Sequence, residues 1–222
     1  MTTFDELKSS CNLKGRTNLF FIYFSCWTLL ILLTLMTTDK YTSFTVINHF
    51  RSYPGDLLFT FFTILGNGTV LIPLAALLLF RKNYPALIGL LLSILLNTLI
   101  VGVLKHFFNH PRPLACYGED IVQTASWIKL YTRYSFPSGH TASAFCMAAY
   151  LSLSYSNDRR VSGIAFVCAV LTGYSRVYLG EHFLEDIWLG SIVGVFTAAA
   201  TYVFVQYYVS RIINAFSKRP KQ

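Results

Sequence analysis

Five side chains that carry a charge or an imidazole lie within twelve residues, from Ser175 to Asp186, between two long apolar runs. A membrane does not solvate charge, so such a density needs a functional reason. A helix that begins near Glu181 would place His182 and Asp186 one turn apart on one face, with the carboxylate leaning towards the imidazole. The carboxylate would hold one ring N–H and leave the other ring nitrogen free to attack an electrophile.

Arg176, in the same stretch, is a candidate for holding the anion under attack. An arginine, an anchored histidine and a helix N-terminus together indicate phosphoryl chemistry, because guanidinium and free backbone N–H groups both bind phosphate oxygens. The structural alternative is that His182 and Asp186 form a satisfied buried pair that holds two helices together.

Two further segments carry residues of the same chemical kind. The first leaves an apolar run at Lys105 and reaches Arg112. These two cations either bind an anion or extend to lipid headgroups, as basic residues at helix ends commonly do. The second segment begins at Pro137. It is either a simple helix start or a ligand site, in which Ser138 is the N-cap and Gly139 allows the backbone to approach a ligand closely. His140 follows, where an imidazole can give a proton to a leaving oxygen.

The composition of the chain is typical of an integral membrane protein. Of its 222 residues, 54% are hydrophobic and only 13% are charged. In a soluble domain, the net charge of +8 would suggest a nucleic-acid partner. In a membrane protein it is explained by the lysines and arginines that gather in the cytoplasmic loops. The five cysteines are widely spaced and mostly inside apolar runs, so no disulfide or thiolate metal site is expected.

Six apolar runs are predicted to cross a membrane as helices. They fall at about 19–36, 57–80, 86–103, 137–154, 161–174 and 187–208. The second is expected to bend around Asn67, which either fills the bend, as we favour, or lines a substrate entrance. Gly190 and Gly194 are expected to pack the last run against another helix. The expected fold is all-α, a single domain over residues 1–222 with six transmembrane helices.

The distribution of basic residues predicts the orientation. Eleven of the 18 lysines and arginines lie near the chain ends and in the turns at 81–84 and 155–160. By the positive-inside rule these parts, and both termini with them, face the cytoplasm. The loop at 104–137 and the stretch at 175–185 then face the periplasm or exterior. Three separated segments with candidate site residues thus converge on one membrane face.

Together, these segments match a known pattern of motifs. Lys-x6-Arg-Pro from Lys105, Pro-Ser-Gly-His from Pro137 and Ser-Arg-x5-His-x3-Asp from Ser175 resemble the type 2 phosphatidic acid phosphatase (PAP2) superfamily. The resemblance covers Lys105 to Asp186 and is specific, because three spaced motifs agree in order. It implies a PAP2-like helical bundle and a metal-independent phosphoric ester hydrolase.

The mechanism of that family, carried onto these positions, gives each residue a role. His182 would attack phosphorus and form a phosphohistidine, with Asp186 supporting its charge. His140 would protonate the departing lipid oxygen and then deprotonate the water that cleaves the intermediate. The phosphoryl oxygens would be bound by Lys105, Arg112, Ser138, Gly139 and Arg176. No metal or cofactor is implied; His106 and His110 have a ligand-like spacing, but a proline follows at once and no third ligand is evident.

The expected partners are a membrane lipid phosphate and the bilayer, with no nucleic acid and no protein partner. The substrate we favour is lipid A, dephosphorylated at the periplasmic face of a bacterial inner membrane, since the chain is similar to the small bacterial lipid phosphatases. Undecaprenyl diphosphate, phosphatidylglycerol phosphate and transfer of phosphate between lipids are the alternatives. A channel or transporter with an anion path along Lys105, Arg112 and Arg176 is less favoured, because the two halves show no internal repeat.

Overall fold

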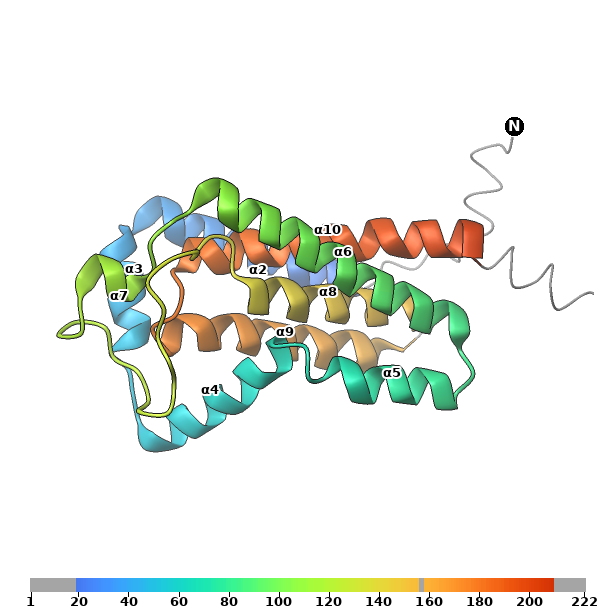
Figure 1. Cartoon of the computed structure of the whole chain (residues 1–222), viewed down its shortest axis with the longest axis horizontal. Coiled ribbons are helices and arrows are strands. Elements are labelled where there is room, and N and C mark those ends of the chain that lie inside the picture. The colour runs from blue at the N-terminus through green and yellow to red at the C-terminus, as the bar shows by residue number, and fades with distance from the viewer. Residues whose placement is uncertain (1–18, 156–157, 210–222) are drawn as a thin grey trace, which may run out of the picture.

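The computed structural model describes residues 19–155 and 158–209, and all regular elements in these ranges are helices. They are α2 (Leu19–Thr37), α3 (Lys40–Asn48), α4 (Tyr53–Gly66), α5 (Leu71–Phe80), α6 (Tyr84–Phe108), α7 (Pro113–Tyr117), α8 (Gly139–Ser154), α9 (Arg159–Tyr178), α10 (Leu184–Phe204) and the π-helical η1 (Val205–Val209). The all-α prediction is therefore confirmed. Figure 1 shows α3, α7 and the loop after α7 at one end of the bundle, and the turn between α5 and α6 at the other.

Four helical segments are long and apolar enough to cross a membrane. They begin at Leu19, Tyr84, Arg159 and Leu184. α4 and α5 qualify only together, with a bend of 56° between them. Asn67 caps the end of α4, and its side-chain oxygen accepts the N–H of Thr69 at 3.1 Å, so it fills the predicted bend. By length and composition, the described residues thus contain at most five spans, one fewer than predicted.

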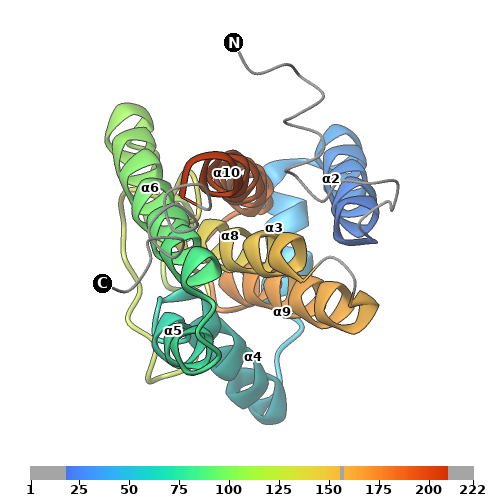
Figure 2. The same ribbon diagram turned by 90° about the vertical axis from the view of Figure 1, so that its right-hand side faces the viewer.

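The predicted span that falls short is α8, which has 16 residues. Figure 2, in which the helices are seen nearly end-on, shows α8 in the middle with α6, α9 and α10 around it. Most of its side chains from Ala142 to Leu153 are buried. Because α8 contacts other helices rather than lipid, its length need not match the thickness of the hydrocarbon layer.

α8 and α10 pack at close range through glycines, as predicted. A Cβ on Gly194 would lie 2.2 Å from the backbone oxygen of Ala142, and one on Gly190 would lie 2.7 Å from that of Ser138. The backbone N–H of Ser138 also donates to the carbonyl oxygen of Asp186 at 3.0 Å. The first turns of the two helices are therefore held directly against each other.

The loop predicted at 104–137 begins later than expected. α6 continues to Phe108, so Lys105 lies in the last turn of this helix, and the short helix α7 follows. The irregular chain after α7 returns to α6, where the N–H of Ser135 donates to the carbonyl oxygen of His110 at 3.0 Å. This return brings the residues just before α8 over the end of the bundle.

Two buried apolar clusters stabilise this arrangement. One surrounds Phe145 and Tyr150 of α8 in the middle of the bundle. The other includes Phe44 of α3, Val177 of α9 and Phe183 at the start of α10. The second cluster fixes the chain on both sides of the turn between α9 and α10, because burial of such side chains is worth about 1.5–3 kcal/mol each.

Candidate active site

The turn between α9 and α10 and the helix ends on either side of it carry polar side chains that are almost completely buried. Their exposed fractions are 5% for Arg176, 3% for Glu181, 1% for His182 and 0% for Asp186. α10 begins at Leu184 rather than near Glu181, so His182 lies ahead of the helix. The predicted placement of His182 and Asp186 on one helical face is therefore wrong.

His182 and Asp186 nevertheless meet, with 3.1 Å between Nδ1 and Oδ2. Asp186 is the third residue of α10, and its Oδ2 also accepts the backbone N–H of Phe183 at 2.9 Å. An acidic residue at this position commonly reaches back over the helix start and satisfies a free N–H. The contact thus comes from helix capping. With Nδ1–H directed at the carboxylate, Nε2 is the ring nitrogen left for a ligand.

Ser135 is a residue of this cluster that the sequence analysis missed. It is fully buried, and its hydroxyl donates to Oδ2 of Asp186 at 2.5 Å and lies 3.3 Å from Nδ1 of His182. Three donors therefore converge on one carboxylate oxygen. The available signal was its position two residues before Pro137, but a loop serine has no periodicity that marks it.

The three cations predicted to bind phosphate come from three elements. Lys105 lies in the last turn of α6, Arg112 directly before α7 and Arg176 in the last turn of α9. Each donates to an oxygen of a neighbour: Lys105 Nζ to the carbonyl of Tyr134 at 2.6 Å, Arg112 Nε to the carbonyl of Arg133 at 3.0 Å, and Arg176 Nη1 to the hydroxyl of Thr63. These bonds restrain the side chains before any ligand arrives.

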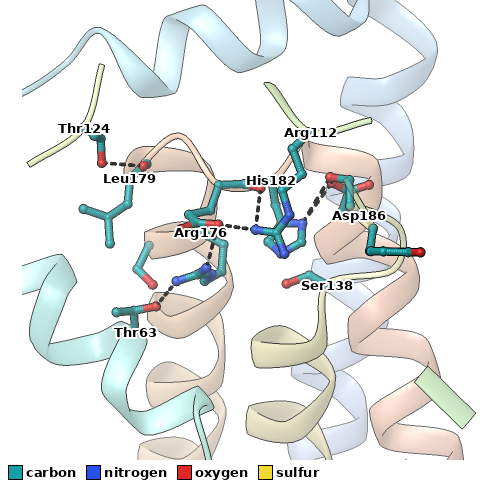
Figure 3. A network of polar contacts seen from close by, with 12 residues as sticks. Thr63, Arg112, Thr124, Ser138, Arg176, Leu179, His182 and Asp186 are labelled. Atoms are coloured by element: carbon teal, nitrogen blue, oxygen red, sulfur yellow. Dashed lines mark hydrogen bonds and ion pairs between the residues drawn. The ribbon is translucent and has the colours of Figure 1, made fainter. Parts of the chain in front are cut away.

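Glu181 is the second residue that the sequence analysis left without a role. Its carboxylate pairs with Nη1 of Arg112, and its Oε2 lies 3.4 Å from Nη2 of Arg176. The backbone N–H groups of Glu181 and His182 both donate to the carbonyl oxygen of Arg176, at 2.9 and 3.1 Å. Figure 3 shows the outcome, with His182 between Arg112 and Asp186 and with Arg176 beside them.

α8 begins beside this cluster. Ser138 is its N-cap, as predicted, and accepts the N–H and the hydroxyl of Thr141 at 3.5 and 3.0 Å. Gly139 is the first residue of the helix, and a Cβ there would lie 3.7 Å from Cε of Lys105. The N-terminus of α8, with its free N–H groups, therefore faces one of the predicted phosphate-binding cations.

His140 lies in the first turn of α8 and is partly exposed, unlike His182. α4 reaches it from the other side, because a Cβ on Gly66 would lie 2.7 Å from the backbone oxygen of His140. The charged or ionisable groups that act on its ring are Arg176, His182, Arg112 and Lys105. All eight predicted site residues thus lie at the same end of the bundle, and the two imidazoles share one set of cations.

Burial, together with the positive charges of Arg112, Arg176 and Lys105, holds the pKa of His182 well below its usual range. The ring is therefore neutral near pH 7, which is the state with a lone pair for attack. A neutral imidazole backed by a carboxylate, three cations and a helix N-terminus can attack a phosphoryl group and stabilise the charge that develops.

His106 and His110, considered as metal ligands from their spacing, face different aromatic rings. The ring of His106 packs on Tyr134 and that of His110 on Phe136. In residues 19–155 and 158–209, no group of three or more His, Cys, Asp and Glu side chains could hold a metal ion.

Comparison with known proteins gives a consistent family. A family model described as PAP2 superfamily matches residues 86–210. The crystal structure of Aquifex aeolicus LpxE is 40% identical, covers 71% of this chain and 91% of that chain, and superposes with a TM-score of 0.63. The range matched by the family model contains all three motifs and every residue of the cluster except Thr63.

Two curated relatives are of similar identity. Phosphatidylglycerophosphatase B of Bacillus subtilis (strain 168) is 33% identical over 60% of this chain and 66% of its own length. Lipid A 4'-phosphatase of Porphyromonas gingivalis is 32% identical over 57% of this chain and 54% of its own length. The aligned part thus spans about half to two thirds of the length of these relatives.

Proposed function

Because the chain belongs to the PAP2 superfamily, we propose that it is an integral membrane enzyme that hydrolyses a phosphate ester or diphosphate of a membrane lipid through a covalent phosphohistidine. The observation that carries this proposal is the 3.1 Å contact of His182 with Asp186 beside three cations from separate elements. A pair that only held two helices together would not need those cations. An anion path is less well supported, because the cations converge on an imidazole.

In the first step, Nε2 of His182 attacks phosphorus, and the bond from phosphorus to the lipid oxygen breaks. The bound phosphoryl group adds negative charge beside His140 and favours its protonated ring, which then gives its proton to that oxygen. Asp186 stabilises the positive charge gained by the ring of His182, since its Oδ2 already accepts the Nδ1 proton. The phosphoryl oxygens are held by Lys105, Arg112, Arg176, the Ser138 hydroxyl and the Gly139 N–H.

In the second step, water gives a proton to His140, and its oxygen attacks phosphorus. The bond from phosphorus to Nε2 of His182 breaks, which releases inorganic phosphate and restores the neutral ring. The partial exposure of His140 supports this role, because the group that exchanges protons with water must be reachable by water.

The proposed enzyme crosses a bacterial inner membrane six times, with α8 as a short enclosed span and both termini in the cytoplasm. The site then faces the periplasm, at the bundle end opposite the basic turn at Arg81 and Lys82 (Figure 1). Thiol labelling tests this orientation. On a Cys116→Ser background, a membrane-impermeant reagent should label Glu119→Cys in intact cells, and Lys82→Cys only after permeabilisation. The reverse pattern would invert the topology.

For the substrate we propose lipid A. The support is the similarity to a protein named lipid A 4'-phosphatase. The similarity to phosphatidylglycerophosphatase B is as strong, so phosphatidylglycerol phosphate is the first alternative. Undecaprenyl diphosphate and transfer of phosphate to a second lipid would use the same residues.

A panel of detergent-solubilised lipids tests both the chemistry and the substrate. Phosphate release is measured from lipid A, phosphatidylglycerol phosphate and undecaprenyl diphosphate with the wild type, His182→Ala and His140→Ala. We expect release to be fastest from lipid A and to fall by at least about 10⁴-fold in His182→Ala. Undiminished release in that variant would rule out the covalent route, and faster release from another lipid would replace lipid A.

A further inference from the structure

The proposed phosphate site already contains an anion of the chain itself. The carboxylate of Glu181 pairs with Arg112 and lies 3.4 Å from Nη2 of Arg176, the two guanidinium groups that a phosphoryl group would use. Glu181 is 3% exposed, so water does not screen these pairs. Since a guanidinium N–H that donates to a carboxylate cannot donate fully to a phosphoryl oxygen at the same time, the two anions compete.

We propose that Glu181 is an internal competitor of the phosphoryl group, which holds both arginines in the free enzyme and gives up Arg112 when substrate binds. The inference rests on the proposed phosphatase function, because it concerns the same site. Its consequence is that inorganic phosphate, the product of hydrolysis, binds weakly and leaves readily.

The charges of the site support this role. Apart from the two imidazoles, Lys105, Arg112 and Arg176 supply three positive charges, and Glu181 and Asp186 supply two negative ones, which leaves a net charge of +1. Without Glu181 the net charge would be +2. A doubly charged phosphate would then be bound much more tightly in this buried place, and its release would be slow.

The contacts of the two arginines indicate which one exchanges its partner. Arg176 is held by Thr63, its Nη2 is at the longer distance from Glu181, and its buried Nε has no partner among the described residues. It can therefore take a phosphoryl oxygen without losing a bond. Arg112 is the more exposed of the two and pairs with Glu181 through Nη1, so this pair must open for its guanidinium to bind substrate.

The test is Glu181→Gln in the full chain, with inorganic phosphate as the probe. Glutamine keeps the shape and one acceptor oxygen but removes the charge. Binding is measured as the rise of the thermal unfolding midpoint with phosphate concentration, and as inhibition of lipid hydrolysis by phosphate. We expect phosphate to bind about tenfold more tightly than to the wild type.

The matched control is Glu185→Gln, four residues further on. Glu185 pairs with Lys40 at 2.5 Å in a half-exposed contact away from the arginines, so its loss should leave phosphate binding unchanged within about twofold. Glu181→Asp is the second variant, in case the glutamine variant does not fold. It keeps the charge but shortens the reach, and should tighten phosphate binding by about threefold.

Opposite results separate the possible roles. If Glu181 only positions the arginines, Glu181→Gln would loosen them and weaken phosphate binding, which overturns the inference. Unchanged binding would overturn it as well. A wild type that binds no phosphate and releases none from any lipid would instead overturn the proposed function, and the inference with it.

Discussion

Helix α2 and the turn between α9 and α10 show opposite relations between polarity and burial. α2 is apolar, yet its Leu29, Leu30 and Met36 are 57%, 62% and 75% exposed. His182 in the turn and Asp186 directly after it are 1% and 0% exposed. This is the inverse of a soluble protein, because hydrocarbon accepts apolar side chains and excludes charge. In this chain the charged side chains are buried where they make hydrogen bonds or ion pairs, and apolar side chains can face lipid. Substitutions in the turn should therefore change activity and stability far more than substitutions in α2.

The largest effect is expected where a buried group loses a partner that carries charge. Asp186→Asn should lower kcat for the lipid hydrolysed by the wild type by about 10³-fold, since the amide cannot stabilise the imidazolium or fix its tautomer. The adjacent Glu185→Gln, in the half-exposed pair with Lys40, is the control and should keep at least about half of the activity. More than a tenth of the wild-type kcat in Asp186→Asn would contradict the role of the carboxylate.

The next effect concerns Arg112, which pairs with Glu181 of the turn, and its influence on the pH dependence of activity. The lowered pKa of His182 places the acid limb of kcat/KM well below pH 6.5, because only the neutral ring attacks. Arg112→Gln removes one of the charges that lower this pKa, so the pKa rises and the acid limb moves upward by roughly one pH unit.

The same substitution should lower the plateau of kcat/KM by about 10²-fold, because one donor to the transition state is lost. The pH profile of the pure variant in detergent is the measurement. An acid limb that stays in place or moves to lower pH would show that Arg112 does not act on His182.

A smaller effect is expected for Ser135, whose hydroxyl contacts Asp186 and Nδ1 of His182 but not the attacking Nε2. Ser135→Ala removes the donor at 2.5 Å from Asp186 and should lower kcat about tenfold with KM unchanged within about twofold. Ser135→Thr keeps the hydroxyl and is the matched control, provided that it folds as judged by thermal unfolding. Equal losses in both variants would point to packing instead of the hydrogen bond.

The smallest effect on activity and stability is expected for the exposed apolar side chains of α2. Leu29→Ala and Leu30→Ala leave apolar side chains in an apolar surrounding, so the free energy of unfolding should change by less than about 0.5 kcal/mol and activity by less than about twofold. Thermal unfolding and phosphate release in lipid nanodiscs check this. A loss comparable to that of Ser135→Ala would mean that α2 contacts more than lipid.

The contrast also explains how far the sequence could predict the molecule. Apolar runs such as Leu19–Thr37 were found because exposure to lipid demands hydrophobicity along the whole helix. α8 was placed correctly but was counted as a span of full length. A helix enclosed by other helices need not match the thickness of the hydrocarbon layer, so its length could not be inferred from that thickness. The start of α10 was misplaced by three residues, since a capping contact from Asp186 and a helical contact leave the same spacing in the sequence.

The cluster was predicted to the extent that its residues stand in motifs. Lys105, Arg112, His140 and His182 lie together as the three motifs require. Ser135 and Glu181 were missed for a physical reason: each contacts a partner from a distant segment, Asp186 for the serine and Arg112 for the glutamate. Such a partner is visible only once the chain has folded.

The central claim is that His182 forms a covalent bond to phosphorus. It is tested most directly by rapidly quenching the enzyme in base after mixing with a lipid substrate labelled with ³²P, followed by digestion and mapping of the labelled peptide. The account predicts base-stable, acid-labile label on the peptide that contains His182 in the wild type, and none in His182→Ala. Label on another residue, or turnover by the wild type without any covalent label, would contradict it.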